Sequence, residues 1–379
     1  MERQNPYLNN IAFFLLMAFA FVMMLSNSLA EFLAAVMLLI WIAQSLAYRR
    51  TDWLHYPLFK PIIALIGYKV IVLLVSGYQG HFGAAFEQLI LPLLYFIVPT
   101  IVVTSERRRK IAWLIISGAV FASGIGLIRY LSGADTRAES LISGSYTLSI
   151  YIAIVLVLVF TFFAYAKKFG EKVFISLVSI PLLTALLYTF SRASYLAITV
   201  VILILGVLKD RKILILIICV LTFIYVFNPQ GVEMIRKRFD VADVQAFYSH
   251  RDVLLELGLP EVNKVGFFGS GINSFPAIVD VENESLIRNK EINSWHNMYL
   301  EYILDDGPLA LVLLFWLFFN QIRYSLARFR KTQELEQKIY QLSFVFLILI
   351  ILILGFFTNP MRDPVISMLT WTLLGLSLI

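Results

Sequence analysis

A histidine and its neighbours are the first side chains whose types and spacing could do chemistry. His296 stands in the run Ser294-Trp295-His296-Asn297, shortly before a long apolar stretch. We predict a helix that Ser294 caps and that ends at Gly307, with His296 in its first turn. With a reference pKa near 6.5, this imidazole can be neutral and accept a proton from a hydroxyl group. The alternative is an interfacial histidine stacked beside Trp295.

Two arginines could bind phosphate. Arg192 lies in the segment 190–194, between two apolar runs with almost no loop. Its planar guanidinium suits phosphate oxygens, and it could equally be an anchor that keeps its charge in water at a helix end. Arg251 lies in the first turn of a predicted amphipathic helix over residues 249–258, where a cation opposes the helix dipole. That position favours an anionic partner for Arg251. The partner could be a bound anionic ligand, or equally the carboxylate of Asp252 or another acid of the loop.

Other ionisable residues are embedded in apolar runs or begin them. Lys69 lies inside one run, and Glu31 and Glu87 begin two others. A buried ion pair is the expected explanation for such an arrangement, and a lysine that faces a phosphate is the alternative. Arg129, at the end of another run, fits either interpretation.

Metal and nucleotide chemistry have no motif in this sequence. The lone Cys219 excludes an internal disulfide and a cysteine-based metal cluster. No two of the histidines have zinc-ligand spacing, and no Asp-x-Asp pair marks a divalent-metal site. The run Gly269-Ser-Gly271 is too short for a phosphate-cradling loop and follows no clear strand. We therefore expect no metal and no cofactor.

The composition shows in which class of protein these candidate residues are found. Of the 379 residues, 60% are hydrophobic and 15% charged, against about 45–50% and 25% in soluble domains. Apolar blocks of about 18 residues recur, and no stretch shows the strict alternation of an outer-membrane barrel. An ordinary soluble enzyme is excluded. We predict an all-α polytopic integral membrane protein.

The apolar runs, cut at charged or Gly- and Pro-containing gaps, predict about 12 transmembrane helices. They cover residues 10–26, 29–47, 58–76, 84–104, 111–131, 146–166, 173–190, 192–208, 212–228, 308–322, 339–357 and 364–379. We therefore divide the chain into spans 1–9 (residues 1–228), a long loop with short helices (229–307) and spans 10–12 (308–379). Ser28 and Ala30 are spaced like a signal-cleavage site, but the nearly neutral residues before them favour a retained first span.

Lysine and arginine in the short loops predict the orientation. The short outer loops would hold only Arg129, Arg137, Arg192 and Arg362. The inner segments would hold Arg3, Arg49, Arg50, Arg107, Arg108, Arg109, Lys110, Lys167, Lys168, Lys172, Lys209, Arg211, Lys212, Arg323, Arg328, Arg330, Lys331 and Lys338. Both termini are therefore expected in the cytoplasm, and the net charge of +6 reflects the inner loops.

The loop 229–307 is consequently expected on the outer side, together with His296 and Arg251. ATP and nucleotide sugars are absent there, so a reaction must draw its energy from a substrate that has already crossed the membrane. The loop mixes both signs of charge, which argues against a nucleic-acid partner.

Three motifs between residues 189 and 307 resemble the O-antigen ligase/polymerase superfamily of bacterial cell-envelope proteins. Thr189-Phe-Ser-Arg-Ala-Ser-Tyr-Leu196 resembles its short Ser/Thr-Arg junction. Arg251-Asp-Val-Leu-Leu-Glu-Leu-Gly-Leu259, followed by Gly266-Phe-Phe-Gly-Ser-Gly-Ile-Asn-Ser-Phe275, resembles its loop arginine with a downstream Gly-x-Gly. His296-Asn-x-x-Leu300, with Asp306-Gly307 leading into a span, resembles its His-Asn helix. Their order and common side are most like the lipopolysaccharide O-antigen ligase branch.

The resemblance implies an inverting, metal-independent glycosyltransferase of the bacterial inner membrane with its active site facing the periplasm. It would transfer a glycan from undecaprenyl pyrophosphate to lipid A-core oligosaccharide. In this family pattern His296 is the general base, and Arg192 and Arg251 bind the pyrophosphate. Asn297 and Lys69 are further candidates. Some members have an acidic residue near the outer start of the last span, and Asp363 is its counterpart here.

Other functions stay open at this point. A polysaccharide polymerase or a protein O-oligosaccharyltransferase of the same superfamily would differ only in the acceptor. A lipid or solute transporter belongs to another class and predicts internal repeats, charges at mid-membrane and broken helices. The sequence has no clear repeat, and Lys69 is the one deep charge. A non-catalytic scaffold would leave the outer arginines unexplained.

Overall fold

A computed structural model describes residues 6–76, 87–142, 144–227, 233, 236, 251–279 and 292–379. Several predictions fall outside these residues: Arg3, the start of the predicted fourth span, and Ser249 with the first part of the loop 229–307. The described elements are α-helices and short 3-10 helices.

The helices follow one another along the chain at the places where the apolar runs predict them. Before the long loop they are α1 (Pro6–Val22), α2 (Asn27–Ala47), η1 (Asp52–His55), α3 (Phe59–Ser76), the helix Glu87–Ile101 with η2 (Leu91–Leu93) and α5 (Leu94–Ile101), α6 (Ser105–Leu131), α7 (Ser145–Tyr165), α8 (Phe169–Tyr188), α9 (Arg192–Leu208) and α10 (Lys212–Phe227). After it come α13 (Arg251–Val262), α14 (Phe275–Ile278), α16 (Met298–Asp306), α17 (Pro308–Lys331), α18 (Leu335–Gly355) and α19 (Pro364–Leu376).

Seven of these helices are long and apolar enough to cross a membrane: α2, α3, α6, α7, α8, α17 and α18. Shorter apolar helices are α1, Glu87–Ile101, α9 and α19. The predicted all-helical, multi-pass membrane fold is therefore confirmed. The count of 12 spans and the cytoplasmic position of both termini stay predictions.

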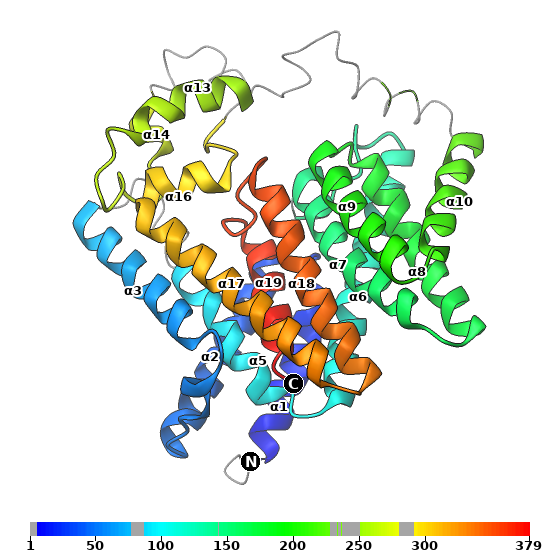
Figure 1. Ribbon diagram of the computed structural model, residues 1–379, viewed down its shortest axis with the longest axis horizontal. Helices are drawn as coiled ribbons and strands as arrows, with labels where there is room; N and C mark the ends of the chain where they lie inside the picture. The colour runs from blue at the N-terminus through cyan, green and yellow to red at the C-terminus, as the bar shows by residue number, and fades with distance from the viewer. Residues whose placement is uncertain are drawn as a thin grey trace.

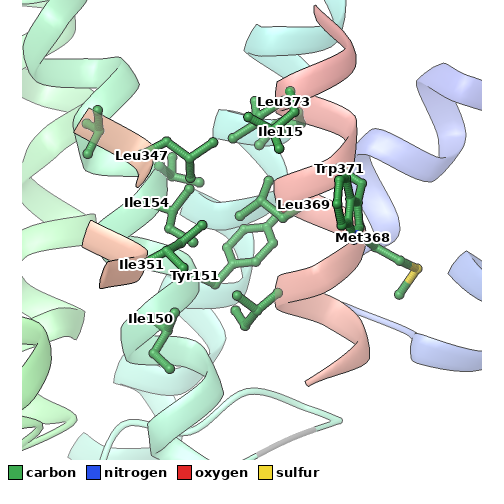
Figure 2. Packing of buried hydrophobic residues seen from close by; sticks show 14 of the residues in the cluster. Ile115, Ile150, Tyr151, Ile154, Leu347, Ile351, Met368, Leu369, Trp371 and Leu373 are labelled. Carbon is green, nitrogen blue, oxygen red and sulfur yellow. The ribbon is translucent and has the colours of Figure 1, made fainter. Parts of the chain in front are cut away.

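Helix α7 is the centre of the bundle. It is apolar on all sides, as expected for a helix that is surrounded by protein. It packs against α6, α8, α9, α18 and α19. Figure 2 shows Tyr151 and Ile154 of α7 among Leu347 and Ile351 of α18 and Leu369 of α19. The first turn of this central helix is consequently held in a fixed place, which matters for the site.

Helices α13, α14 and α16 lie together at one end of the bundle, and the start of α1 and the end of α19 lie toward the opposite end (Figure 1). A small second core joins the three short helices; its buried members are Leu254, Phe275, Val279, Trp295, Leu300 and Leu304. Helix α16 also packs against α17, and α17 against α3. Residues 251–279 and 292–307 are thus attached to the bundle through these contacts.

Two helix ends differ from the prediction. Helix α13 does not stop at Gly258 but runs to Val262, because Gly258 is needed for close packing: a Cβ there would lie 2.6 Å from Leu300 Cδ2 and 2.9 Å from Trp295 Cζ3. The predicted cap at Ser294 is also wrong. Asn297 caps α16 instead, since its side chain accepts a hydrogen bond from the Leu300 amide at 3.0 Å. The predicted end at Gly307 is confirmed.

Candidate active site

A short turn after α18 brings three of the predicted site residues, Arg251, His296 and Asn297, close together. The carbonyl groups of residues 356–358 accept hydrogen bonds from Arg251 Nε at 3.0 Å, Asn297 Nδ2 at 3.4 Å and the Met298 amide at 3.0 Å. The Arg251 guanidinium also lies over the Phe357 ring, 5.8 Å from its centre. This turn therefore places the start of α13 and the start of α16 side by side, with His296 immediately before Asn297.

His296 lies between the buried Trp295 and the capping Asn297, and not in the first turn of the helix. Its φ is 47°, in the left-handed region that histidine enters more readily than most residues. Burial and the neighbouring cations Arg251 and Arg362 lower the pKa of His296 to about 4. The imidazole is therefore neutral at physiological pH and can accept a proton.

Arg362 is a cation that the sequence interpretation counted on the outer side without giving it a role. It lies in the turn before α19, and its Nη1 donates to Glu301 Oε1 of α16 at 2.8 Å. Its Nη2 donates to Asn273 Oδ1. Since the Glu301 side chain is only 3% exposed, the ion pair is largely shielded from water. Arg362 is thereby held next to His296 by two elements at once.

The predicted Gly-x-Gly segment fixes the other end of α16. A Cβ on Gly269 would lie 2.3 Å from the Asp305 carbonyl oxygen, and one on Gly307 would lie 2.1 Å from the Phe267 carbonyl oxygen. Both glycines also have positive φ, 71° and 88°. The Asp305 carboxylate accepts from the Asn273 amide at 3.0 Å and from Ser274 Oγ at 2.7 Å. Gly269 and Gly307 thus allow two backbone segments to approach each other more closely than any residue with a Cβ would.

Lys69 forms a buried ion pair with a partner far away in the sequence. Its Nζ donates to Asp306 Oδ2 at 2.6 Å and to Gln88 Oε1 at 2.9 Å, and it lies 4.8 Å from the centre of the Tyr302 ring. The ion pair that was expected for Lys69 is thus present, but its acid is Asp306 and neither Glu31 nor Glu87. It joins α3 to the end of α16.

Replacing Lys69 with methionine is expected to destabilise the protein by about 3–5 kcal/mol, because Asp306 would be left buried without a counter-charge. Thermal unfolding in detergent measures the effect. The double variant K69M/D306L removes both charges and should recover much of the loss. Lys110, in an exposed pair with Glu106, is the matched control, and K110M should change little. Equal melting temperatures for K69M and K110M would contradict the prediction.

Asp363 has both carboxylate oxygens engaged in structure. Oδ1 caps α19 by accepting from the amides of Val365 at 3.0 Å and Ile366 at 3.2 Å, and Oδ2 accepts from Thr147 Oγ1 at 2.5 Å. Thr147 belongs to the first turn of α7, and the adjacent Tyr146 lies near enough to Arg251 to interact with it electrostatically. Asp363 therefore ties the start of the last helix to the central helix beside the site.

Arg192 is the first residue of α9 and follows a tight junction after α8. Phe190 has a φ of 54°, so the chain reverses there with hardly a loop, as the sequence predicts. Ser194 Oγ lies 2.8 Å from Ser149 Oγ, which joins the start of α9 to the first part of α7. This bond places the start of α9, and with it Arg192, against the first part of α7.

The arrangement can support one type of chemistry particularly well. A neutral imidazole can take a proton from a hydroxyl group, and the adjacent guanidinium of Arg251 can stabilise negative charge on a phosphate. Among the described residues, no group of three or more His, Cys, Asp or Glu is placed to hold a metal ion.

Residues 177–315 match the family described as O-antigen ligase. This region is similar to the O-antigen ligase family. The resemblance of the motifs to the O-antigen ligase/polymerase superfamily is thereby confirmed, and members of this family are glycosyltransferase-like ligases and polymerases. A comparison with curated proteins gave no significant match.

The matched region contains His296, Arg251 and Arg192, and some of the residues that hold α16 in place lie outside it. Arg362 and Lys69 are beyond its limits, yet both pair with acids of α16. Sequence reasoning missed the role of Arg362, although its place among the few outer basic residues was a signal. It missed Glu301 and Tyr146 as well, for which no pattern in the sequence gives a signal.

Proposed function

We propose that this protein transfers a glycan from undecaprenyl pyrophosphate to the lipid A-core oligosaccharide, at the periplasmic face of the bacterial inner membrane. The observation that carries the proposal is the placement of a neutral His296 beside Arg251 within the region that is similar to the O-antigen ligase family. The position of α13, α14 and α16 at the end of the bundle away from both termini supports an active site on the side opposite to them (Figure 1).

The proposed reaction is a single displacement with inversion at the sugar. His296 accepts the proton of an acceptor hydroxyl, and the oxygen forms a bond to the anomeric carbon of the donor glycan. The bond from that carbon to the pyrophosphate oxygen breaks, and its electron pair leaves with the pyrophosphate. Arg251 and Arg192 stabilise the charge that grows on the leaving group. Pyrophosphate is already activated, so the step needs no further energy source.

The remaining candidates act by positioning in this proposal. Asn297 caps α16 and bonds to the turn 356–358, so it fixes the residue that precedes it. Lys69 holds the other end of α16 through Asp306. Asp363 fixes the start of α19 against α7. These groups keep the imidazole and the guanidinium in place without touching the substrate.

The pH profile follows from the lowered pKa of His296. Because the free enzyme loses the imidazole proton at about pH 4, kcat/KM should stay level between about pH 5 and pH 7. The negative pyrophosphate favours the imidazolium, so the acid limb of kcat should lie at higher pH than that of kcat/KM. Initial rates across this range measure both limbs. A fall in kcat/KM centred near the ordinary histidine pKa of about 6.5 would contradict the prediction.

A purified reaction tests the proposed function directly. The protein in detergent or nanodiscs receives undecaprenyl pyrophosphate that carries a glycan, together with lipid A-core or with a second lipid-linked glycan. Consumption of lipid A-core supports the ligase. Elongation of the second lipid-linked glycan would instead identify a polymerase, and a glycosylated acceptor protein would identify an O-oligosaccharyltransferase. No turnover with any acceptor, while vesicles with the protein move a lipid or solute, would replace the enzyme with a transporter.

A further inference from the structure

The first turn of α7 brings a hydroxyl group to the site that the proposed mechanism does not use. The hydroxyl oxygen of Tyr146 is buried, with the Thr358 side chain as its hydrogen-bonding neighbour, and no group in the described part of the chain accepts its proton. It lies within electrostatic reach of Arg251 and Asp363 and beside Thr358 of the turn that gathers the site. A buried hydroxyl whose proton has no acceptor costs free energy, so such a group in a functional site calls for a ligand that can accept it.

The chemistry around Tyr146 decides what that ligand would be. A phenol donates one hydrogen bond, and the charge beside it is the Arg251 guanidinium, so an anionic oxygen is favoured. The Asp363 carboxylate is already engaged by Thr147 and by two amides of α19, and is therefore not a ready partner for the phenol. A phosphate oxygen bound by Arg251 would meet both donors.

A second tyrosine of the same helix shows that burial of the hydroxyl alone is not the argument. The Tyr151 hydroxyl likewise has no acceptor for its proton among the described residues, and this side chain is 0% exposed. Its surroundings differ, because it packs among aliphatic side chains of α18 and α19 (Figure 2). No charged side chain in the described ranges interacts with it. Tyr146 is distinguished by its position beside Arg251.

We propose that Tyr146 is a substrate-binding residue whose hydroxyl donates a hydrogen bond to a phosphate oxygen of the lipid-linked donor, next to Arg251. The inference rests on the proposed function, since that function supplies the pyrophosphate. It adds to the site a neutral donor from the central helix. Because α7 is held on all sides by the bundle, this donor is rigidly placed before the substrate arrives.

Binding of undecaprenyl pyrophosphate to the full-length protein in nanodiscs tests the inference. Y146F removes only the hydroxyl and keeps the ring, and we expect its Kd to rise about tenfold, the effect of one hydrogen bond to a charged group. Y151F is the matched control and should bind as the wild type does. The melting temperatures of both variants should equal that of the wild type. Unchanged binding by Y146F, or an equal loss in Y151F, would overturn the inference.

Turnover measured on the same preparations separates this inference from the proposed function. If the wild type binds undecaprenyl pyrophosphate tightly and Y146F binds it weakly, the assignment of Tyr146 stands even when no glycan is transferred. If the wild type transfers glycan and Y146F keeps the wild-type kcat/KM and Kd, the function stands and the assignment of Tyr146 fails. Absence of binding by the wild type would overturn both.

Discussion

Replacing His296 with asparagine should lower kcat for glycan transfer by about 10²–10⁴-fold, the usual contribution of a general base. The residue has a φ of 47°, which asparagine also adopts readily, whereas alanine would add backbone strain at the start of α16. Asparagine therefore removes the base and keeps the backbone. The variant H296A should lose at least as much activity and some stability as well. Initial rates in the purified reaction measure the effect, and melting temperatures show whether the fold is intact.

His55 provides the control for this experiment. It is an exposed histidine at the end of η1, in the region predicted to face the cytoplasm. The variant H55A should keep the wild-type kcat and KM. A kcat of H296N within about threefold of the wild type, in a preparation with an unchanged melting temperature, would remove His296 from the role of base.

Replacing Arg251 with alanine should lower kcat/KM by about 10²–10³-fold, the range observed when one preorganised donor to a developing anion is removed. Arg251 Nε donates a hydrogen bond to the Phe357 carbonyl, which fixes the orientation of the guanidinium group. The positive charge of this group therefore stays beside His296. Lysine keeps the charge but has neither the Nε donor nor the planar fork. We therefore expect R251K to lie between the wild type and R251A in kcat/KM, with a raised KM for the donor.

The control for Arg251 lies just after the same helix. Lys264 follows α13, and its exposed side chain pairs with Glu261 at 2.7 Å. The variant K264A should leave kcat/KM for the lipid-linked donor unchanged, because exposed ion pairs contribute little. Wild-type kinetics in R251K would show that the charge alone matters, and wild-type kinetics in R251A would exclude Arg251 from the donor site.

The arrangement of the helices along the chain could be predicted closely because it depends on local sequence. An apolar run of sufficient length forms a helix wherever it occurs in a membrane, since its backbone groups have no other partners there. The charged and glycine-containing gaps then mark the ends, as at Gly307 before α17. The prediction failed at Gly258 because this glycine packs against Leu300 and Trp295, and it failed at Ser294 because Asn297 caps α16 instead.

The candidate site could be predicted only in part. The motifs singled out His296, Arg251 and Arg192, because a short run of neighbouring residues is needed to cap a helix or to reverse the chain. The sequence identified Arg362 only as one of the few basic residues in the outer loops, where lysine and arginine are rare. Its bond to Glu301 connects residues 61 positions apart, and no periodicity of either segment announces it.

The sequence by itself determined that this is a helical membrane protein and that the candidates His296 and Arg251 share one hydrophilic segment, because hydropathy and charge act over distances of a few residues. The tertiary structure decided which of those side chains meet. The pair of Lys69 with Asp306 spans 237 positions, and the bond of Arg251 to Phe357 spans 106. Such contacts depend on how whole helices pack, and the depressed pKa of His296 follows from that packing: burial and two cations from separate segments set it.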